Sequence, residues 1–89
     1  MYVLKYSGKI KKDLKLCQKR NFDFSLLEKV LEKLMIPEPL ENKNKDHNLS
    51  GKYAGFRECH ISPDWLLIYR YRDKYLELYR TGTHSDLFR

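Results

Sequence analysis

Cysteine is scarce in this chain of 89 residues, with Cys17 and Cys59 far apart and outside any C-x-x-C spacing. The absence of that spacing excludes a dithiol redox motif, and we expect both thiols to be reduced. Cys59 directly precedes His60, but neighbouring residues on a strand face opposite sides of the sheet, so this pair does not predict a nucleophilic site. Both cysteines are predicted to be small core residues.

Long apolar runs are also missing. The N-terminal stretch "MYVLKYSGKIKK" holds too short an apolar segment for a signal peptide or a membrane span. Repeats and low-complexity tracts do not occur, and 89 residues predict a single domain, over 1–89, with one modest core. We therefore expect a one-domain cytoplasmic protein without a membrane partner.

Acidic residues are in the minority. Lysine and arginine number 18 against 12 for aspartate and glutamate, which gives a formal net charge of +6 and a pI near 9.4. This balance favours polyanions, and charge alone does not choose among nucleic acid, an anionic membrane and an acidic protein. Hydrophobic residues at 42% and aromatic residues at 13% lie well above the disordered range, so the chain is expected to fold.

The first half of the chain predicts a strand and an amphipathic helix. Residues 2–6, "YVLKY", form a β-branched and aromatic run, and Ser7 follows as the N-cap of a helix that ends near Asn21. Its apolar stripe consists of Ile10, Leu14 and Cys17. The lysines on its other faces form either a solvated surface or a nucleic-acid patch, and the candidates for RNA binding are Lys11, Lys12 and Lys15.

A second helix is predicted over residues 23–36, "DFSLLEKVLEKLMI", with Ser25 and Glu28 in a capping-box pattern. Pro37 and Pro39 stop this helix. Residues 37–55 are polar and predict one long surface loop, and loops of this length without structure are uncommon unless they are functional.

Three strands joined by short turns are predicted in the second half, over residues 56–61, 65–72 and 75–80. The element order is therefore β-α-α-β-β-β. This order predicts an α+β fold of two layers, in which a helical hairpin packs on one face of a small, mainly antiparallel sheet and leaves the other face open.

The candidate chemistry lies in three histidines with acids nearby in the sequence. The nearby acids are Asp46 for His47, Asp64 for His60 and Asp86 for His84. Histidine donates and accepts protons near neutral pH, which suits general acid–base catalysis. The same three histidines match no standard zinc-ligand spacing, so a metal site is the weaker interpretation.

Strand alternation places some of these side chains. If Cys59 and Ile61 face the helices, His60 faces the open side, and Asp64 is expected close to it across the turn. Arg80 is in register with residues that face the helices, so it reaches the open face only if the strand ends or bulges near Thr81-Gly82.

Such a set predicts RNA cleavage by attack of the 2′-OH on its own phosphate. The reaction needs a base, a cation for the charge on the phosphorane, and an acid for the 5′-oxygen, roles that histidine or aspartate, arginine and histidine fill. Phe88 or Trp65 could stack on a splayed base. Packing in the core is the alternative for Trp65 and for Tyr69.

The chain also resembles the YafQ branch of the RelE/ParE toxin superfamily. The motifs are "NKDHNLSG" (44–51), "GFRECHISPDWLLIY" (55–69) and "RTGTHSDLF" (80–88), and "YSGKIKKDLKLCQKR" in the first half is similar too. The resemblance implies two helices against a small sheet. It also implies a toxin of a type II toxin–antitoxin pair that cuts messenger RNA in the ribosomal A site without a metal or another cofactor.

The resemblance marks the site residues His47, His60, Asp64, Arg80, His84 and Phe88. It implies that His84 is the general acid, that Asp64 or His60 is the base, and that Arg80 stabilises the phosphorane. Phe88 would position the RNA, and His47 would donate to phosphate or act as a second acid.

Two other functions remain open at this point: a ParE-like toxin that poisons DNA gyrase, and a non-catalytic module that binds RNA or the ribosome. The toxin interpretation also implies a cognate antitoxin. We expect an acidic amphipathic segment of it to cover unpaired charge at Arg80 and Arg89 beside an exposed Phe88.

Overall fold

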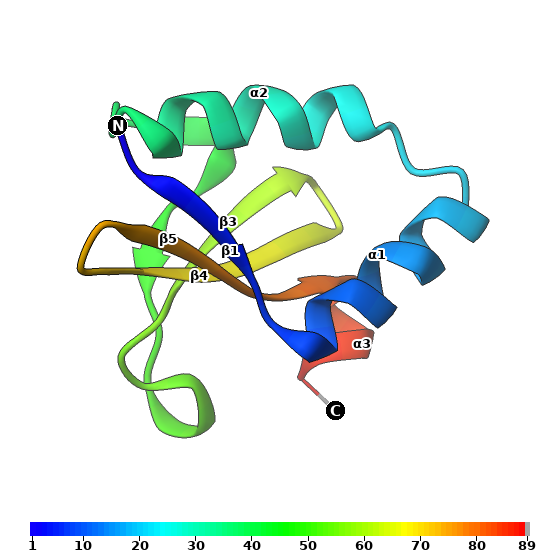
Figure 1. Cartoon of the computed structure of the whole chain (residues 1–89). Coiled ribbons are helices and arrows are strands. Elements are labelled where there is room, and N and C mark those ends of the chain that lie inside the picture. Colours follow the sequence, from blue (N-terminus) through cyan, green and yellow to red (C-terminus); the bar gives the residue numbers. More distant parts are fainter. Residues whose placement is uncertain (89) are drawn as a thin grey trace.

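Two helices lie on one face of a five-stranded sheet in the computed structural model, which describes residues 1–88 (Figure 1). The main elements are β1 Val3–Tyr6, α1 Gly8–Lys19, α2 Phe24–Met35, β2 His47–Asn48, β3 Arg57–Ser62, β4 Trp65–Arg72, β5 Tyr75–Gly82 and α3 His84–Leu87. The strand order is β1-β5-β4-β3-β2, with β1 parallel to β5 and the other pairs antiparallel. The predicted α+β fold is confirmed, and β2 and α3 are additions to it.

Both long helices begin at a side-chain cap. The Ser7 hydroxyl accepts from Ile10 N at 3.0 Å, as predicted. In α2 the prediction was wrong, because the cap is Asp23, whose Oδ1 accepts from Ser25 N at 3.0 Å. Ser25 is therefore already inside the helix. The helix ends at Met35, before the two prolines.

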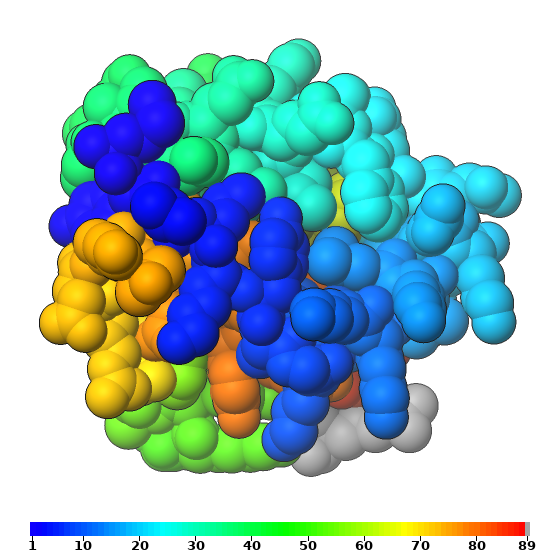
Figure 2. Space-filling model, viewed as in Figure 1, coloured from blue at the N-terminus to red at the C-terminus, as the bar shows by residue number. Residues whose placement is uncertain are grey.

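The main core lies between the helices and the sheet. Its buried members are Ile10, Cys17, Leu27, Val30 and Leu34 from the helices, and Cys59, Ile61, Trp65, Leu67, Tyr69, Leu76 and Leu78 from the sheet. In the view of Figure 2, β1, α1 and α2 cover much of this side of the molecule.

Both cysteines are buried, as predicted, and burial raises the pKa of the Cys17 thiol to about 11 and that of Cys59 further. The thiols are therefore protonated at neutral pH.

The opposite face of the sheet is less open than predicted. A second buried cluster of Tyr53, Leu66, Ile68 and Leu87 lies there. Residues 37–55 are not one unstructured loop, since they contain 3₁₀ turns at Asn42–Asn44 and Gly51–Tyr53 and the short strand β2. Tyr53 fixes this segment to α3 through a hydrogen bond from its hydroxyl to the Leu87 carbonyl at 3.1 Å.

No helix within residues 1–88 combines the length and the apolar character needed to cross a bilayer.

Candidate functional site

Strand register brings two β3 side chains to the face away from the long helices. His60 pairs with Leu66, and Glu58 pairs with Ile68. Paired residues of an antiparallel ladder point to the same side of the sheet. Leu66 and Ile68 belong to the second cluster, so His60 lies on the face that the sequence predicted.

A bulge in β5 brings Arg80 to this face as well. Leu78 pairs with Tyr69 and Arg80 pairs with Ile68, which leaves Tyr79 as the extra residue. The expected irregularity is therefore present one position before Arg80, slightly earlier than the Thr81-Gly82 step. Since Glu58 and Arg80 flank Ile68 on neighbouring strands, their Cα atoms are about 10 Å apart.

Glu58 is the acid that contacts two of the histidines. Its Oε1 lies 3.6 Å from Nε2 of His47 and 3.6 Å from Nε2 of His60. The residue is 5% exposed, and its Oε2 is buried without a hydrogen-bond partner within residues 1–88. His47 is also held through its Nδ1, 2.6 Å from the Lys45 carbonyl.

The acids expected beside the histidines have other partners. Asp46 accepts from the Tyr69 hydroxyl at 2.6 Å and pairs with Arg57 at 3.2 Å. Asp64 accepts from the backbone N–H of His84 at 3.1 Å, and no ion pair joins it to His60 within the described chain. Asp46 and Asp64 therefore bind other groups, and the acid in contact with His47 and His60 is Glu58.

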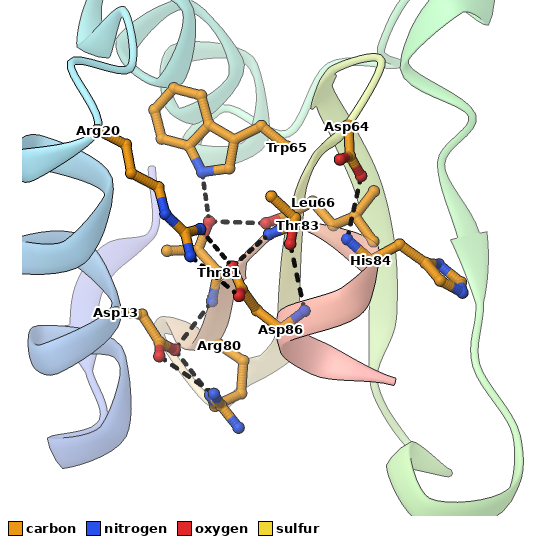
Figure 3. Close-up of polar contacts among 10 residues, drawn as sticks. All are labelled: Asp13, Arg20, Asp64, Trp65, Leu66, Arg80, Thr81, Thr83, His84 and Asp86. Atoms are coloured by element: carbon orange, nitrogen blue, oxygen red, sulfur yellow. Dashed lines mark hydrogen bonds and ion pairs between the residues drawn. The ribbon is translucent and has the colours of Figure 1, made fainter. Parts of the chain in front are cut away.

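A capping box holds the short helix that carries His84. The Thr83 hydroxyl accepts from Asp86 N, and Asp86 Oδ2 accepts from Thr83 N at 2.9 Å (Figure 3). Arg20 at the end of α1 donates to the same Oδ2 from Nη1 at 2.7 Å. The hydrogen bond from Arg20 lowers the pKa of Asp86 to about 2. His84 itself is exposed, and its ring points away from this network (Figure 3).

Arg80 is paired, contrary to the prediction of free charge. Its Nε donates to Asp13 Oδ2 at 2.7 Å, and its Nη2 donates to Asp13 Oδ1 at 3.1 Å. Asp13 also accepts from Thr81 N at 3.1 Å. Arg89, the other expected source of free charge, lies outside the described residues.

The candidates for RNA contact fall into two groups. Phe88 is 36% exposed, and its ring centroid lies 4.9 Å from that of His84, so it can meet a nucleotide beside this histidine. The lysines of α1, Lys11, Lys12 and Lys15, are all exposed. Trp65 is a correction: it is 2% exposed and donates from Nε1 to Thr81 Oγ1 at 2.8 Å, so it packs in the core and does not offer a face to a base.

Sequence reasoning missed Glu58, Asp13 and Arg20. Glu58 carried a signal, because it shares the parity of His60 on the same strand. The partners of Arg80 and Asp86 lie far away in the chain, and only the packing of α1 beside β5 and α3 brings them together. The spacing of residues along the sequence does not predict such contacts.

The candidate groups of this small basic α+β domain are histidines, carboxylates and one arginine. Imidazoles and carboxylates transfer protons, and a guanidinium stabilises an anionic transition state. Cleavage of a phosphodiester requires groups of these kinds and involves no redox step. Along residues 2–89 the chain matches the family described as "Bacterial toxin of type II toxin-antitoxin system, YafQ", and it belongs to that family. The family resemblance of the motifs is thereby confirmed.

The chain is similar to several proteins in both sequence and structure. The mRNA interferase toxin YafQ of Escherichia coli K12 is 48% identical over 87 residues, which cover 96% of this chain and 94% of the relative. The crystal structure of YafQ from E. coli BL21(DE3) is 41% identical, with a TM-score of 0.91 and full coverage of both chains. The E. coli DinJ–YafQ complex matches over the whole of both chains as well, with a TM-score of 0.89 and 42% identity.

Proposed function

We propose that this toxin is an endoribonuclease that cleaves mRNA, as the name mRNA interferase of its E. coli relative suggests. The observation that carries the proposal is that strand register brings His60 and Arg80 to one face of the sheet, while the exposed His84 begins the short helix α3 that directly follows β5. The ribosome, with mRNA in its A site, is the proposed setting for cleavage.

The proposed reaction is attack of the 2′-OH on the adjacent phosphate. A base takes the 2′ proton, the P–O2′ bond forms, the P–O5′ bond breaks, and an acid protonates the leaving 5′-oxygen. The products are a 2′,3′-cyclic phosphate and a 5′-OH. DNA lacks the 2′-OH, so the proposed site acts on RNA.

His60 is the better candidate for the base. Its Nε2 lies 3.6 Å from the Glu58 side chain, so the ring has an acidic group beside it on the face where Arg80 also lies. Asp64 is already engaged with the His84 N–H. His84 is the proposed acid because its ring is exposed beside Phe88, which would hold the nucleotide.

Arg80 would stabilise the charge of the phosphorane, and His47 would donate to phosphate or act as a second acid. His47 and His60 share one acidic neighbour, since Nε2 of each ring lies 3.6 Å from the same Oε1 atom of Glu58. Glu58 therefore contacts two of the histidines proposed for the reaction.

The test is cleavage of mRNA by purified protein, with and without ribosomes, followed by analysis of the product ends. We expect 2′,3′-cyclic phosphate ends, and a substrate with a 2′-deoxy group at the cleavage position should remain whole. His84→Ala should lower the cleavage rate roughly 10²–10⁴-fold, the range for one general acid. Its thermal midpoint should stay near that of the wild type, because the ring is exposed.

Other outcomes would identify other functions. Binding to ribosomes without cut ends would indicate a non-catalytic module. Inhibition of DNA gyrase without RNA cleavage would indicate a ParE-like toxin. Wild-type cleavage by the His84→Ala variant would remove this residue from the mechanism.

We also propose a cognate antitoxin as the protein partner, in analogy with the DinJ–YafQ complex. Since Arg80 is paired with Asp13, the acidic segment of an antitoxin would meet the exposed lysines of α1 or the surface around Phe88 and His84.

A further inference from the structure

Arg80 is held from outside its own strand, by a helix that carries none of the proposed proton-transfer groups. Asp13 lies in the middle of α1 and takes two hydrogen bonds from Arg80, from Nε at 2.7 Å and from Nη2 at 3.1 Å. The side chains are 14% and 21% exposed, so solvent screens this pair only in part. The pair also raises the pKa of Arg80 above its ordinary value, which keeps the guanidinium charged.

The two contacts occupy one edge of the guanidinium. Arginine offers five N–H groups in a planar fork, and a carboxylate that binds Nε and Nη2 leaves the edge formed by Nη1 and Nη2. Neither hydrogen bond to Asp13 uses Nη1. The remaining edge has the geometry that binds two oxygens of a phosphate.

Asp13 is itself fixed in place. Its Oδ2 accepts from Thr81 N at 3.1 Å in addition to Arg80 Nε, so the carboxylate spans from α1 to two consecutive residues of β5 (Figure 3). A cleft of about 230 Å³ opens at this point, lined by Asp13, Leu16, Arg80, Thr81 and Asp86. The guanidinium therefore has a defined orientation before substrate arrives.

We propose that Asp13 is a positioning residue for the cleavage step: it binds the inner edge of Arg80 and presents the outer edge to the reacting phosphate. This inference rests on the proposed ribonuclease function. Asp13 does not touch the substrate, and it acts through Arg80 alone. Pre-organisation of this kind contributes to the rate of the chemical step, because a misplaced charge stabilises the phosphorane poorly.

The test uses Asp13→Asn, which keeps the shape of the side chain but removes its charge and one acceptor. We expect the single-turnover cleavage rate on the ribosome to fall roughly 10- to 100-fold, while the dissociation constant for the ribosome changes less than about threefold. In Arg80→Ala, the further change Asp13→Asn should have no additional effect on the rate. Glu32→Gln, which removes one exposed acidic charge from α2, is the matched control for loss of a negative charge and should cleave at the wild-type rate once bound.

A second readout does not depend on cleavage. The Nε–Hε NMR signal of Arg80 should be protected from solvent exchange in the wild type and lose that protection in Asp13→Asn. If Asp13→Asn does not fold, Arg80→Lys gives the same information in the presence of Asp13: a lysine has no second edge to present, so its rate should also fall at least about tenfold.

Several results would overturn the proposal. Faster cleavage or tighter RNA binding by Asp13→Asn would show that Asp13 competes with phosphate for Arg80. An additive loss of rate in the double variant would show that Asp13 does not act through Arg80. An unprotected Arg80 Hε in the wild type would show that Asp13 does not hold the guanidinium. If the wild type does not cut RNA while its Arg80 Hε is protected, the ribonuclease function fails and the orientation of Arg80 stands.

Discussion

Replacement of Gly82 by alanine would place a methyl group against the carboxylate that caps α3. A Cβ atom at this position would lie 2.8 Å from Asp86 Oδ2 and 3.1 Å from Asp86 Cβ. The φ angle of Gly82 is +153°, which L-residues rarely adopt. Gly82→Ala therefore demands both a strained backbone and a displaced Asp86.

The magnitude follows from these two changes. Backbone strain of this kind costs about 1–3 kcal/mol. Displacement of Asp86 removes the capping box with Thr83, worth about 1 kcal/mol, and weakens the ion pair with Arg20. The free energy of unfolding should fall by roughly 2–4 kcal/mol, and for a domain of this size each kcal/mol lowers the thermal midpoint by about 4–8 °C.

The assay is thermal and urea unfolding of Gly82→Ala beside Gly8→Ala. A Cβ at Gly8 meets no atom within 4 Å, and this residue opens α1, so the control should change stability by less than about 1 kcal/mol. Cleavage by Gly82→Ala should also fall, because α3 carries His84. A thermal midpoint equal to that of the wild type would refute the role assigned to this glycine.

Three further predictions concern charge. Replacing Lys11, Lys12 and Lys15 with glutamine should reduce the salt dependence of RNA or ribosome affinity. If each lysine contacts a phosphate, the slope of log affinity against log salt concentration should become shallower by about 2. An unchanged slope would mean that these lysines are only solvated. The pKa of Asp86 is about 2 in the folded protein, below its ordinary value of 3.8, so its contribution to stability is complete above pH 4 and is lost as the pH falls towards 2. Urea midpoints measured across this pH range should show the loss of stability, and the Asp86→Asn variant should not show it. A co-purified antitoxin complex should not cleave RNA, and added salt should slow its association more than it speeds its dissociation; cleavage as fast as that of the free toxin would contradict this account.

Local patterns in the sequence predicted the elements well because each depends on nearby residues. The Ser7 cap and the stripe of Ile10 and Cys17 depend only on residues in or next to α1. The strand predicted over 65–72 has the same bounds as β4. The cap of α2 was misjudged because Asp23 and Ser25 are both good capping residues, and the structure uses the first.

The sequence predicted the position of one candidate side chain on the sheet, but it predicted few of the contacts around the candidates. Alternation along β3 placed His60 correctly, because side-chain direction on a strand follows parity. Glu58 was missed as the acid beside His47 and His60, and Asp46, the neighbour of His47 in the chain, accepts a hydrogen bond from the Tyr69 hydroxyl. The contact between Asp13 and Arg80 depends on how α1 packs beside β5, which no local pattern encodes.

The parallel pairing of β1 with β5 bears on how the toxin is made. Val3 to Tyr6 bond to Tyr75 to Leu78, and β5 lies between β1 and β4 in the sheet. β1 is synthesised long before β5 and can join the sheet only after it, and such a high sequence separation slows folding. The segment that completes the sheet also carries Arg80 and leads directly into His84. A nascent chain on the ribosome thus has neither a complete sheet nor all of the candidate site residues until synthesis has passed this segment.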